Sequence, residues 1–207
     1  DAEYVIVGMG SMMETASVAV DVARANGIKA GALTITCFRP FPTQQIASAL
    51  KSAKVVAVVE RMDNPLAQSN PLTVEVKAAL FDCGMKVEVI SGVAGLGSRD
   101  IRPGDFGAVI NEMTSTQKRK FFSLGINHPT VLKRAPTAEP EGVFILRGHS
   151  IGGYGSITTN KVLASYISQA HTMAVYAYPK YGSEKKGLPT TFYLSISKEK
   201  IRSRCEV

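Results

Sequence analysis

Two stretches in the last third of the chain carry residue types that bind phosphorylated ligands. Residues 148–156 read Gly-His-Ser-Ile-Gly-Gly-Tyr-Gly-Ser, and residues 178–187 read Tyr-Pro-Lys-Tyr-Gly-Ser-Glu-Lys-Lys-Gly. Glycines allow backbone amides to approach an anion closely, and a helix beginning behind them adds a partial positive charge. The second stretch places three lysines on a loop bounded by proline and glycine. Together the stretches predict a site for a phosphate-bearing ligand that is assembled from two loops.

A plain tight turn and a solvated lysine loop are the alternative interpretations. The glycine loop has neither the spacing of a dinucleotide-binding loop nor that of a P-loop. The ligand site is favoured because two independent anion-binding features lie close in the sequence. The candidate contacts are Gly152, Gly153, Gly155, Lys180, Ser183, Lys185 and Lys186.

Other motifs favour structural roles. Residues 8–11, Gly-Met-Gly-Ser, follow an apolar run, but Met13 replaces the third glycine of the dinucleotide fingerprint and no acidic residue follows about 20 positions later. We interpret them as a turn between a strand and a helix. Arg39 and the pair Glu60-Arg61 come at strand ends, where α/β sheets bind ligands. We expect them to hold the sheet edge against a neighbouring domain.

The cysteines and histidines predict no metal site. Cys37, Cys83 and Cys205 are far apart and form no CxxC pair, and the three histidines share no ligand spacing. Isolated cysteines indicate a reducing compartment, so we expect a cytoplasmic protein. No apolar run approaches the roughly 18 residues of a membrane span. The chain opens on Asp1 rather than Met, directly before an apolar run, and is expected to be a piece of a longer polypeptide.

Positive charge is concentrated in the second half of the chain. Residues 1–114 contain 10 Lys and Arg against 12 Asp and Glu, whereas residues 115–207 contain 14 against 5. The formal charges are therefore −2 and +9. A basic half indicates an anionic partner, and nucleic acid, an acidic protein or a phosphorylated cofactor all satisfy that condition.

The elements that position these residues alternate between strand and helix, which predicts an α/β fold of two small units with mostly parallel sheets. In the first unit we expect strands at 4–8, 30–36, 55–60 and 86–90, with helices between them. In the second we expect strands at 143–147, 173–178 and 191–196 and a helix at 156–169. The predicted domains are 1–114 and 143–207, joined by a proline-rich linker at 115–142 with a helix near Phe121.

The motifs resemble a known enzyme family. Residues 148–156 and 178–187 look like the coenzyme A-contacting domain of pyruvate:ferredoxin oxidoreductase and its 2-oxoacid:ferredoxin relatives. Residues 39–42 (Arg-Pro-Phe-Pro), 60–61 and 95–101 (Gly-Leu-Gly-Ser-Arg-Asp-Ile) are similar to the preceding domain of these enzymes, which resembles the transketolase C-terminal domain. The resemblance covers nearly the whole chain and keeps the order of the two domains.

This resemblance implies oxidative decarboxylation of a 2-oxoacid, with pyruvate the expected one, and coenzyme A to give acyl-CoA, carbon dioxide and electrons for ferredoxin or flavodoxin. It implies thiamine diphosphate and iron–sulfur clusters in the complete enzyme, bound outside this chain, and no catalytic residue within it. The chain would scaffold the thiamine domains and hold coenzyme A. Lys180, Lys185 and Lys186 would pair with phosphates, while Ser183 and the amides of 152–155 donate hydrogen bonds. The partners would be the remaining domains or subunits in an oligomer.

Two other function classes remain. The basic half suits a nucleotide- or nucleic-acid-binding module, although aromatic residues are not interleaved with the basic ones as stacking platforms require, so no nucleic-acid partner is predicted. A non-catalytic structural subunit is the third class. Salt-sensitive RNA binding would favour the module, and the absence of any ligand would favour the structural subunit.

Overall fold

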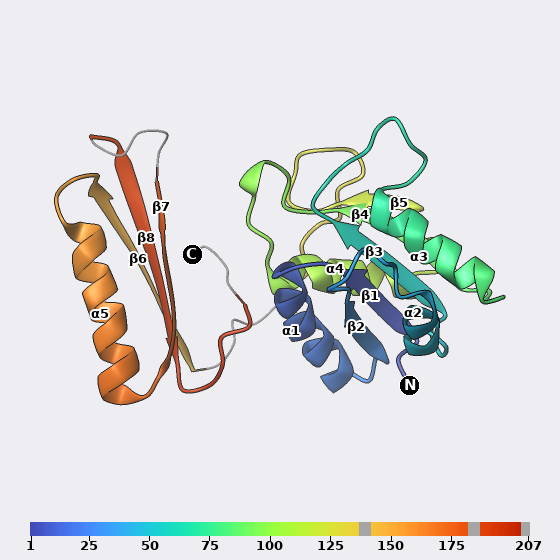
Figure 1. Cartoon of the computed structure of the whole chain (residues 1–207), viewed down its shortest axis with the longest axis horizontal. Helices are drawn as coiled ribbons and strands as arrows, with labels where there is room; N and C mark the ends of the chain where they lie inside the picture. Colours follow the sequence, from blue (N-terminus) through green and yellow to red (C-terminus); the bar gives the residue numbers. More distant parts are fainter. Residues whose placement is uncertain (137–141, 182–186, 204–207) are drawn as a thin grey trace. The chain divides into compact units, whose positions relative to one another are not determined.

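The computed structural model describes residues 1–136, 142–181 and 187–203. The chain separates into two compact units, Asp1–Thr137 and Ala138–Val207 (Figure 1). Each unit has its own sheet and its own hydrophobic core. The predicted α/β class is confirmed.

The first unit is a five-stranded parallel sheet with helices on both faces. Its strands lie in the order β2-β1-β3-β4-β5, and every neighbouring pair is parallel. Its elements in chain order are β1 Tyr4–Gly8, α1 Met12–Ala25, β2 Ala30–Thr34, α2 Thr43–Ala49, β3 Val55–Glu60, α3 Pro71–Asp82, β4 Glu88–Val93, the 3-10 turn η1 Leu96–Ser98, α4 Pro103–Thr114 and β5 Phe121–Ser123.

Burial on both faces explains the apolar central strands of this sheet. All six residues of β3 are buried, as its unbroken valine-rich sequence predicts. Side chains alternate along β1, so Ile6 packs in the core with α1 and α4, while Val5 and Val7 pack in the core with α2 and α3. Figure 1 shows the two helix pairs on opposite faces of the sheet.

The predicted linker at 115–142 belongs in part to the first sheet. A helix was expected near Phe121, but Phe121–Ser123 forms strand β5 beside β4. Phe122, Leu124 and Leu132 join the core of the first unit. Gly92 permits this close pairing, because a Cβ atom there would lie 2.2 Å from the Phe122 ring. The prediction failed because a three-residue strand is too short to show a period of two, and the neighbouring basic run dominates the composition.

The second unit consists of β6 Val143–Ile151, α5 Ser156–His171, β7 Ala174–Lys180 and β8 Pro189–Ser197. Its strand order is β6-β8-β7, and both pairs are antiparallel. The prediction of a mostly parallel sheet is therefore wrong for this unit. Strands β6 and β7 do run in the same direction on either side of the α5 crossover, but β8 returns from β7 as a hairpin and inserts between them.

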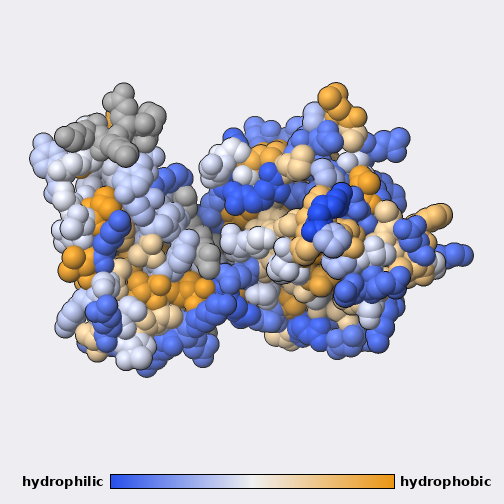
Figure 2. Space-filling model, viewed as in Figure 1, coloured by the Kyte–Doolittle hydropathy of each residue, from blue (hydrophilic) through white to orange (hydrophobic). Residues whose placement is uncertain are grey.

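A small core holds the second unit together. Ala164 of α5 packs against Phe192 and Leu194 of β8, which places α5 on one face of the sheet. Apolar side chains also reach the surface of this unit, where Figure 2 shows hydrophobic atoms. Those on β6 and α5 are Phe144, Ile151, Val162, Leu163 and Tyr166. Among the described residues, no helix has the length and apolar content needed to cross a membrane.

Candidate functional site

Backbone hydrogen bonds join the glycine loop to the hairpin between β7 and β8. The amide of Gly152 donates to the carbonyl oxygen of Leu188 at 3.0 Å, and the amide of Gly187 donates to the carbonyl oxygen of Gly152 at 3.3 Å. The strand register agrees, because Ile151 at the end of β6 pairs with Pro189 at the start of β8. The two stretches of interest therefore lie at the same end of the second sheet.

The glycine loop has a backbone that favours glycine and leads directly into α5. Gly153 and Gly155 have φ angles of +102° and +79°, in the region that L-residues with side chains rarely adopt. A Cβ atom at either position would meet no heavy atom within 4 Å, so this part of the loop is open. The hydroxyl groups of Ser150 and Ser156 share a hydrogen bond that connects the end of β6 to the first residue of α5.

The start of α5 is the main source of anion-binding groups in this loop. The first amides of a helix lack intrahelical acceptors, and the helix dipole places a partial positive charge there. The amide of Gly152 already donates to Leu188, so Gly152 joins the loops rather than presenting its amide to a ligand. The candidate donors are therefore the amides that follow it and those of the first turn of α5.

Of the predicted lysine-loop residues, the structure describes only Lys180. Lys180 is the last residue of β7 and is exposed, and it lies opposite Thr191 of β8. Side chains alternate along a strand, and Phe192, the next residue, packs toward α5. Thr191 and Lys180 therefore lie on the face of the sheet opposite α5. Ser183, Lys185 and Lys186 lie outside the described residues.

Two polar residues beside Lys180 were not predicted as site residues. Thr191 also pairs with His149 of β6, and the Oγ1 atom of Thr191 lies 3.1 Å from Nδ1 of His149. His149 drew attention in the sequence because it lies in the glycine-rich stretch. Nothing in the sequence pairs Thr191 with it, because strand register depends on the insertion of β8.

The sheet edge of the first unit has a structural explanation. The carboxylate of Glu60 is buried and accepts hydrogen bonds from the amides of Leu72 and Thr73 at 2.7 and 3.1 Å. Arg39 forms an ion pair with Glu75 of α3 at 2.6 Å. Glu60 and Arg39 thus contact α3 of their own unit, and the expectation that this edge also packs against a neighbouring domain stays a prediction.

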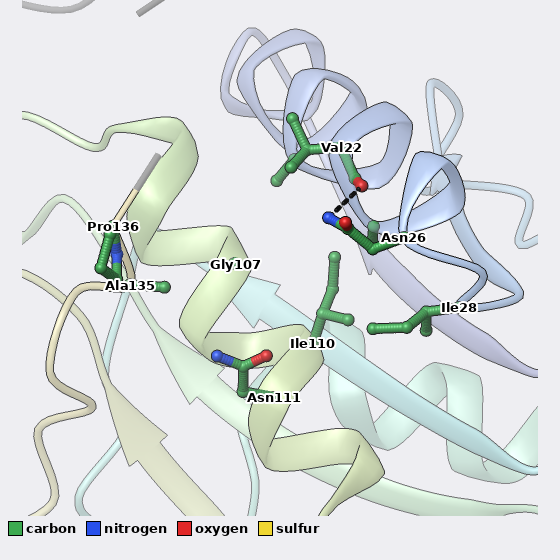
Figure 3. A pocket seen from close by; sticks show the side chains of 10 residues that line it. Val22, Asn26, Ile28, Gly107, Ile110, Asn111, Ala135 and Pro136 are labelled. Atoms are coloured by element: carbon green, nitrogen blue, oxygen red, sulfur yellow. Dashed lines mark hydrogen bonds between the residues drawn. The ribbon is translucent and has the colours of Figure 1, made fainter. Parts of the chain in front are cut away.

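A surface groove of about 180 Å³ lies between α1 and α4 in the first unit (Figure 3). Its lining is mostly apolar, with Val22, Ile28, Ile110 and the side-chain amide of Asn111. No ionisable side chain lines it. It contains none of the predicted site residues, and in the described part of the chain no three His, Cys, Asp or Glu side chains cluster as a metal site would need.

Two family models match the chain. The model for pyruvate:ferredoxin oxidoreductase core domain II matches residues 2–106, and the model for pyruvate ferredoxin/flavodoxin oxidoreductase matches residues 145–207. Pyruvate-flavodoxin oxidoreductase from Klebsiella pneumoniae is 30% identical over 210 residues, which cover 98% of this chain and 18% of that protein. Pyruvate:ferredoxin oxidoreductase from Moorella thermoacetica is 31% identical over 209 residues, with the same two coverages of 98% and 18%.

A solved structure of 2-oxoglutarate:ferredoxin oxidoreductase from Magnetococcus marinus, with 2-oxoglutarate, coenzyme A and succinyl-CoA bound, is 18% identical. The match covers 56% of this chain and 18% of that one, with a TM-score of 0.41. The chain thus spans about 18% of the length of the curated relatives described above.

Proposed function

The chain belongs to the pyruvate:ferredoxin oxidoreductase family, and from this premise we propose that it is part of an enzyme that converts pyruvate and coenzyme A to acetyl-CoA and carbon dioxide. The electrons would pass to ferredoxin or flavodoxin. The first unit corresponds in this proposal to the transketolase C-terminal-like domain, and the second to part of the coenzyme A-contacting domain. The matches of residues 2–106 and 145–207 to two family models support this division.

The second unit holds coenzyme A in this proposal. The ligand's pyrophosphate would lie at the start of α5, where the first-turn amides and the helix dipole stabilise an anion. Ser183, Lys185 and Lys186, which lie outside the described residues, would add a hydroxyl donor and two positive charges. The observation that carries the proposal is the pair of backbone hydrogen bonds between Gly152 and residues 187–188, because it holds Gly187, the residue that follows the lysine pair in the sequence, beside the glycine loop.

The remaining chemistry belongs to parts of the enzyme outside this chain. Bound thiamine diphosphate would supply the carbanion that attacks the keto carbon, and iron–sulfur clusters would carry the electrons. Cys37, Cys83 and Cys205 are far apart in the sequence and do not form the clustered thiolate set that an iron–sulfur site needs. The chain's own residues would bind and orient the thiol-bearing cosubstrate and support the neighbouring domains in a cytoplasmic oligomer.

The test is equilibrium binding of coenzyme A to the complete enzyme. Replacing both Lys185 and Lys186 with alanine should raise the coenzyme A Kd, because a charge-assisted hydrogen bond contributes about 1.5–3 kcal/mol, or roughly 10- to 100-fold in affinity. Thiamine diphosphate loading and pyruvate decarboxylation should not change.

Lys185→Ala and Lys186→Ala are also measured one at a time, and Lys198→Ala is the control that matches each of them in charge. It removes the same charge directly after Ser197, which lies at the end of the sheet opposite the glycine loop. The control should keep the wild-type Kd. If the double variant folds and also keeps the wild-type Kd, the coenzyme A site is not in this hairpin.

A further inference from the structure

Two arginines flank the turn that follows β4 in the first unit. Arg61 comes directly after β3, and its guanidinium lies against Gly95, because a Cβ atom on that glycine would be 3.0 Å from Nε of the arginine. Arg99 lies against Gly97 in the same way, since a Cβ atom there would be 2.9 Å from one of its terminal nitrogens. Both side chains therefore lie at the carboxyl ends of β3 and β4.

The backbone holds this turn beside the end of β3. The amide of Ala94 donates to the carbonyl oxygen of Glu60 at 2.9 Å. Ser98 has a φ angle of +58°, a left-handed conformation that is uncommon for a residue with a side chain. Such conformations concentrate at functional positions of a fold, where the surrounding structure maintains them. The turn is therefore a defined feature of this edge of the sheet.

Neither arginine has a carboxylate partner in the part of the chain that the structure describes. Arg61 forms no hydrogen bond or ion pair there, and Arg99 donates only to the carbonyl oxygen of Leu96, at 3.1 Å. The acidic residue of the same turn, Asp100, is paired with Arg102 at 2.9 Å instead. A guanidinium has five N–H donors in a planar fork that fits a carboxylate, so most of these donors can bind a partner.

The loop between β3 and α3 carries exposed apolar side chains beside Arg61. Met62 is 43% exposed and Leu66 is 97% exposed. The buried side chain of Asn70 donates to the carbonyl oxygen of Met62 at 3.0 Å and accepts from the amide of Asn64 at 2.9 Å, which ties the two ends of the loop together. Figure 1 shows this loop above the carboxyl edge of the first sheet.

This combination fits a protein partner better than a small anion. Arginine and methionine are enriched in protein interfaces, and apolar side chains become buried there. A small anion would explain the arginines but not the exposed Leu66. The chain spans about 18% of the length of its curated relatives, so most of such an enzyme lies outside it. Asp63 is exposed in the same loop and is the nearby carboxylate that could compete with a partner.

We propose that Arg61 and Arg99 bind carboxylate side chains of a neighbouring domain of the complete enzyme, and that Met62 and Leu66 pack against apolar atoms of the same domain. The inference rests on the proposed function, because it takes this chain as part of a larger enzyme. The partner surface would place Asp or Glu beside apolar side chains.

Carbodiimide coupling in the complete enzyme tests the contact at Arg61. The reagent joins an amine to a carboxylate in contact with it, forming an amide with loss of water, and it does not couple a guanidinium. In the Arg61→Lys variant, the introduced amine should couple to an Asp or Glu outside residues 1–207, identified by mass spectrometry after digestion. Wild-type enzyme should show no coupling at this position. Coupling to Asp63 or to another residue within 1–207 alone, or no coupling, would contradict the proposal.

Hydrogen exchange in the complete enzyme tests whether one partner covers both loops. Leu66→Ser should make the amides of residues 95–99 exchange roughly 10-fold faster, because burial of a leucine side chain has about that effect on a docked state. Leu66 is 97% exposed, so its loss has no direct effect on the turn. Phe81→Ser is the control, because Phe81 is 82% exposed at the other end of α3, and it should leave this exchange unchanged. Unchanged exchange in Leu66→Ser would show that no shared partner covers the two loops.

An assay of pyruvate-dependent acetyl-CoA formation separates this inference from the proposed function. If the enzyme is active and neither test gives the expected result, the docking surface is wrong and the proposed function stands. If the enzyme is inactive with pyruvate and coenzyme A, the proposed function fails, whereas coupling from position 61 to a residue outside 1–207 would still support the docking surface.

Discussion

Asp105 joins two separate segments of the first unit through one buried carboxylate. It is 2% exposed, accepts from Nε and a terminal guanidinium nitrogen of Arg134 at 2.9 Å each, and accepts from the amide of Arg102 at 2.8 Å. Asp105→Asn should lower the free energy of unfolding by about 1–3 kcal/mol. The loss should be less than for a fully buried pair, because the side chain of Arg134 is 42% exposed.

Urea unfolding followed by circular dichroism measures this loss. Asp63→Asn is the matched control, because Asp63 is exposed, and it should change stability by no more than about 0.5 kcal/mol. Equal effects of the two substitutions would show that the Asp105–Arg134 pair does not hold residues near 134 against α4.

Glu60 stabilises the start of α3 in a way that a neutral side chain can only partly replace. Its carboxylate accepts three hydrogen bonds, from the Leu72 amide, the Thr73 amide and the Thr73 hydroxyl. Glu60→Gln removes the negative charge at the N-terminus of α3. It also turns the side-chain NH2 group of the glutamine toward a backbone N–H or hydroxyl donor that the carboxylate had accepted from. We expect a loss of about 1–3 kcal/mol in urea unfolding.

The Thr73→Val variant separates the contribution of the Thr73 hydroxyl from that of the two backbone amides. Thr73→Val deletes the hydroxyl and keeps both backbone amides bonded to Glu60, so its effect should be smaller than that of Glu60→Gln. A larger effect for Thr73→Val would mean that the hydroxyl contact with Ser91, 3.0 Å away, is the more important one.

Individual residues differ in how well the sequence predicts them. The glycines at 153 and 155 were correctly expected to shape a loop before a helix, because glycine alone adopts such φ angles readily. The role of Glu60 was missed because its partners are 12 and 13 residues away on another element. The face on which Lys180 lies could not be predicted, because it depends on the register of β7 against β8.

At the scale of elements, Glu3 connects the starts of three strands in the first sheet. Its carboxylate lies 3.1 Å from Nζ of Lys29, before β2, and 2.5 Å from Nζ of Lys54, before β3. The hydrogen bonds from Lys54 and Lys29 lower the pKa of Glu3, and the contact with Glu3 raises the pKa of Lys54.

A lowered carboxyl pKa gives the folded state an advantage above the ordinary pKa of Glu, and that advantage disappears as the pH falls through the folded-state value. The ordinary pKa of a Glu side chain lies between pH 3 and pH 6. When the pH is lowered from 6 to 3, the free energy of unfolding of the wild type should therefore fall by more than that of Glu3→Gln. Paired urea titrations at the two pH values measure the difference. It should shrink in about 1 M salt, because the groups are solvent-accessible. Parallel pH curves would contradict the prediction.

The sequence predicted elements that have a clear apolar pattern. It did not predict the position of a strand within its sheet, which depends on strand pairing. The alternation of strand and helix in the first unit predicted β1 to β4, because each strand is an apolar run between helices. The position of β8 between β6 and β7 could not be predicted, since a strand–helix–strand pattern is compatible with adjacent or separated parallel strands. The three residues of β5 carry too little pattern to be recognised.

At the scale of the whole molecule, separate cores predict separate unfolding. Leu194 is 0% exposed in the small core of the second unit, and Leu50 is 0% exposed in a core of the first. Leu194→Ala and Leu50→Ala remove the same atoms and should each cost about 2–5 kcal/mol. In hydrogen exchange on the full chain, Leu194→Ala should reduce amide protection in β6, β7 and β8 and leave β1 and β3 protected. Leu50→Ala should do the reverse. Loss of protection in all five strands from either substitution would show that the two units unfold as one.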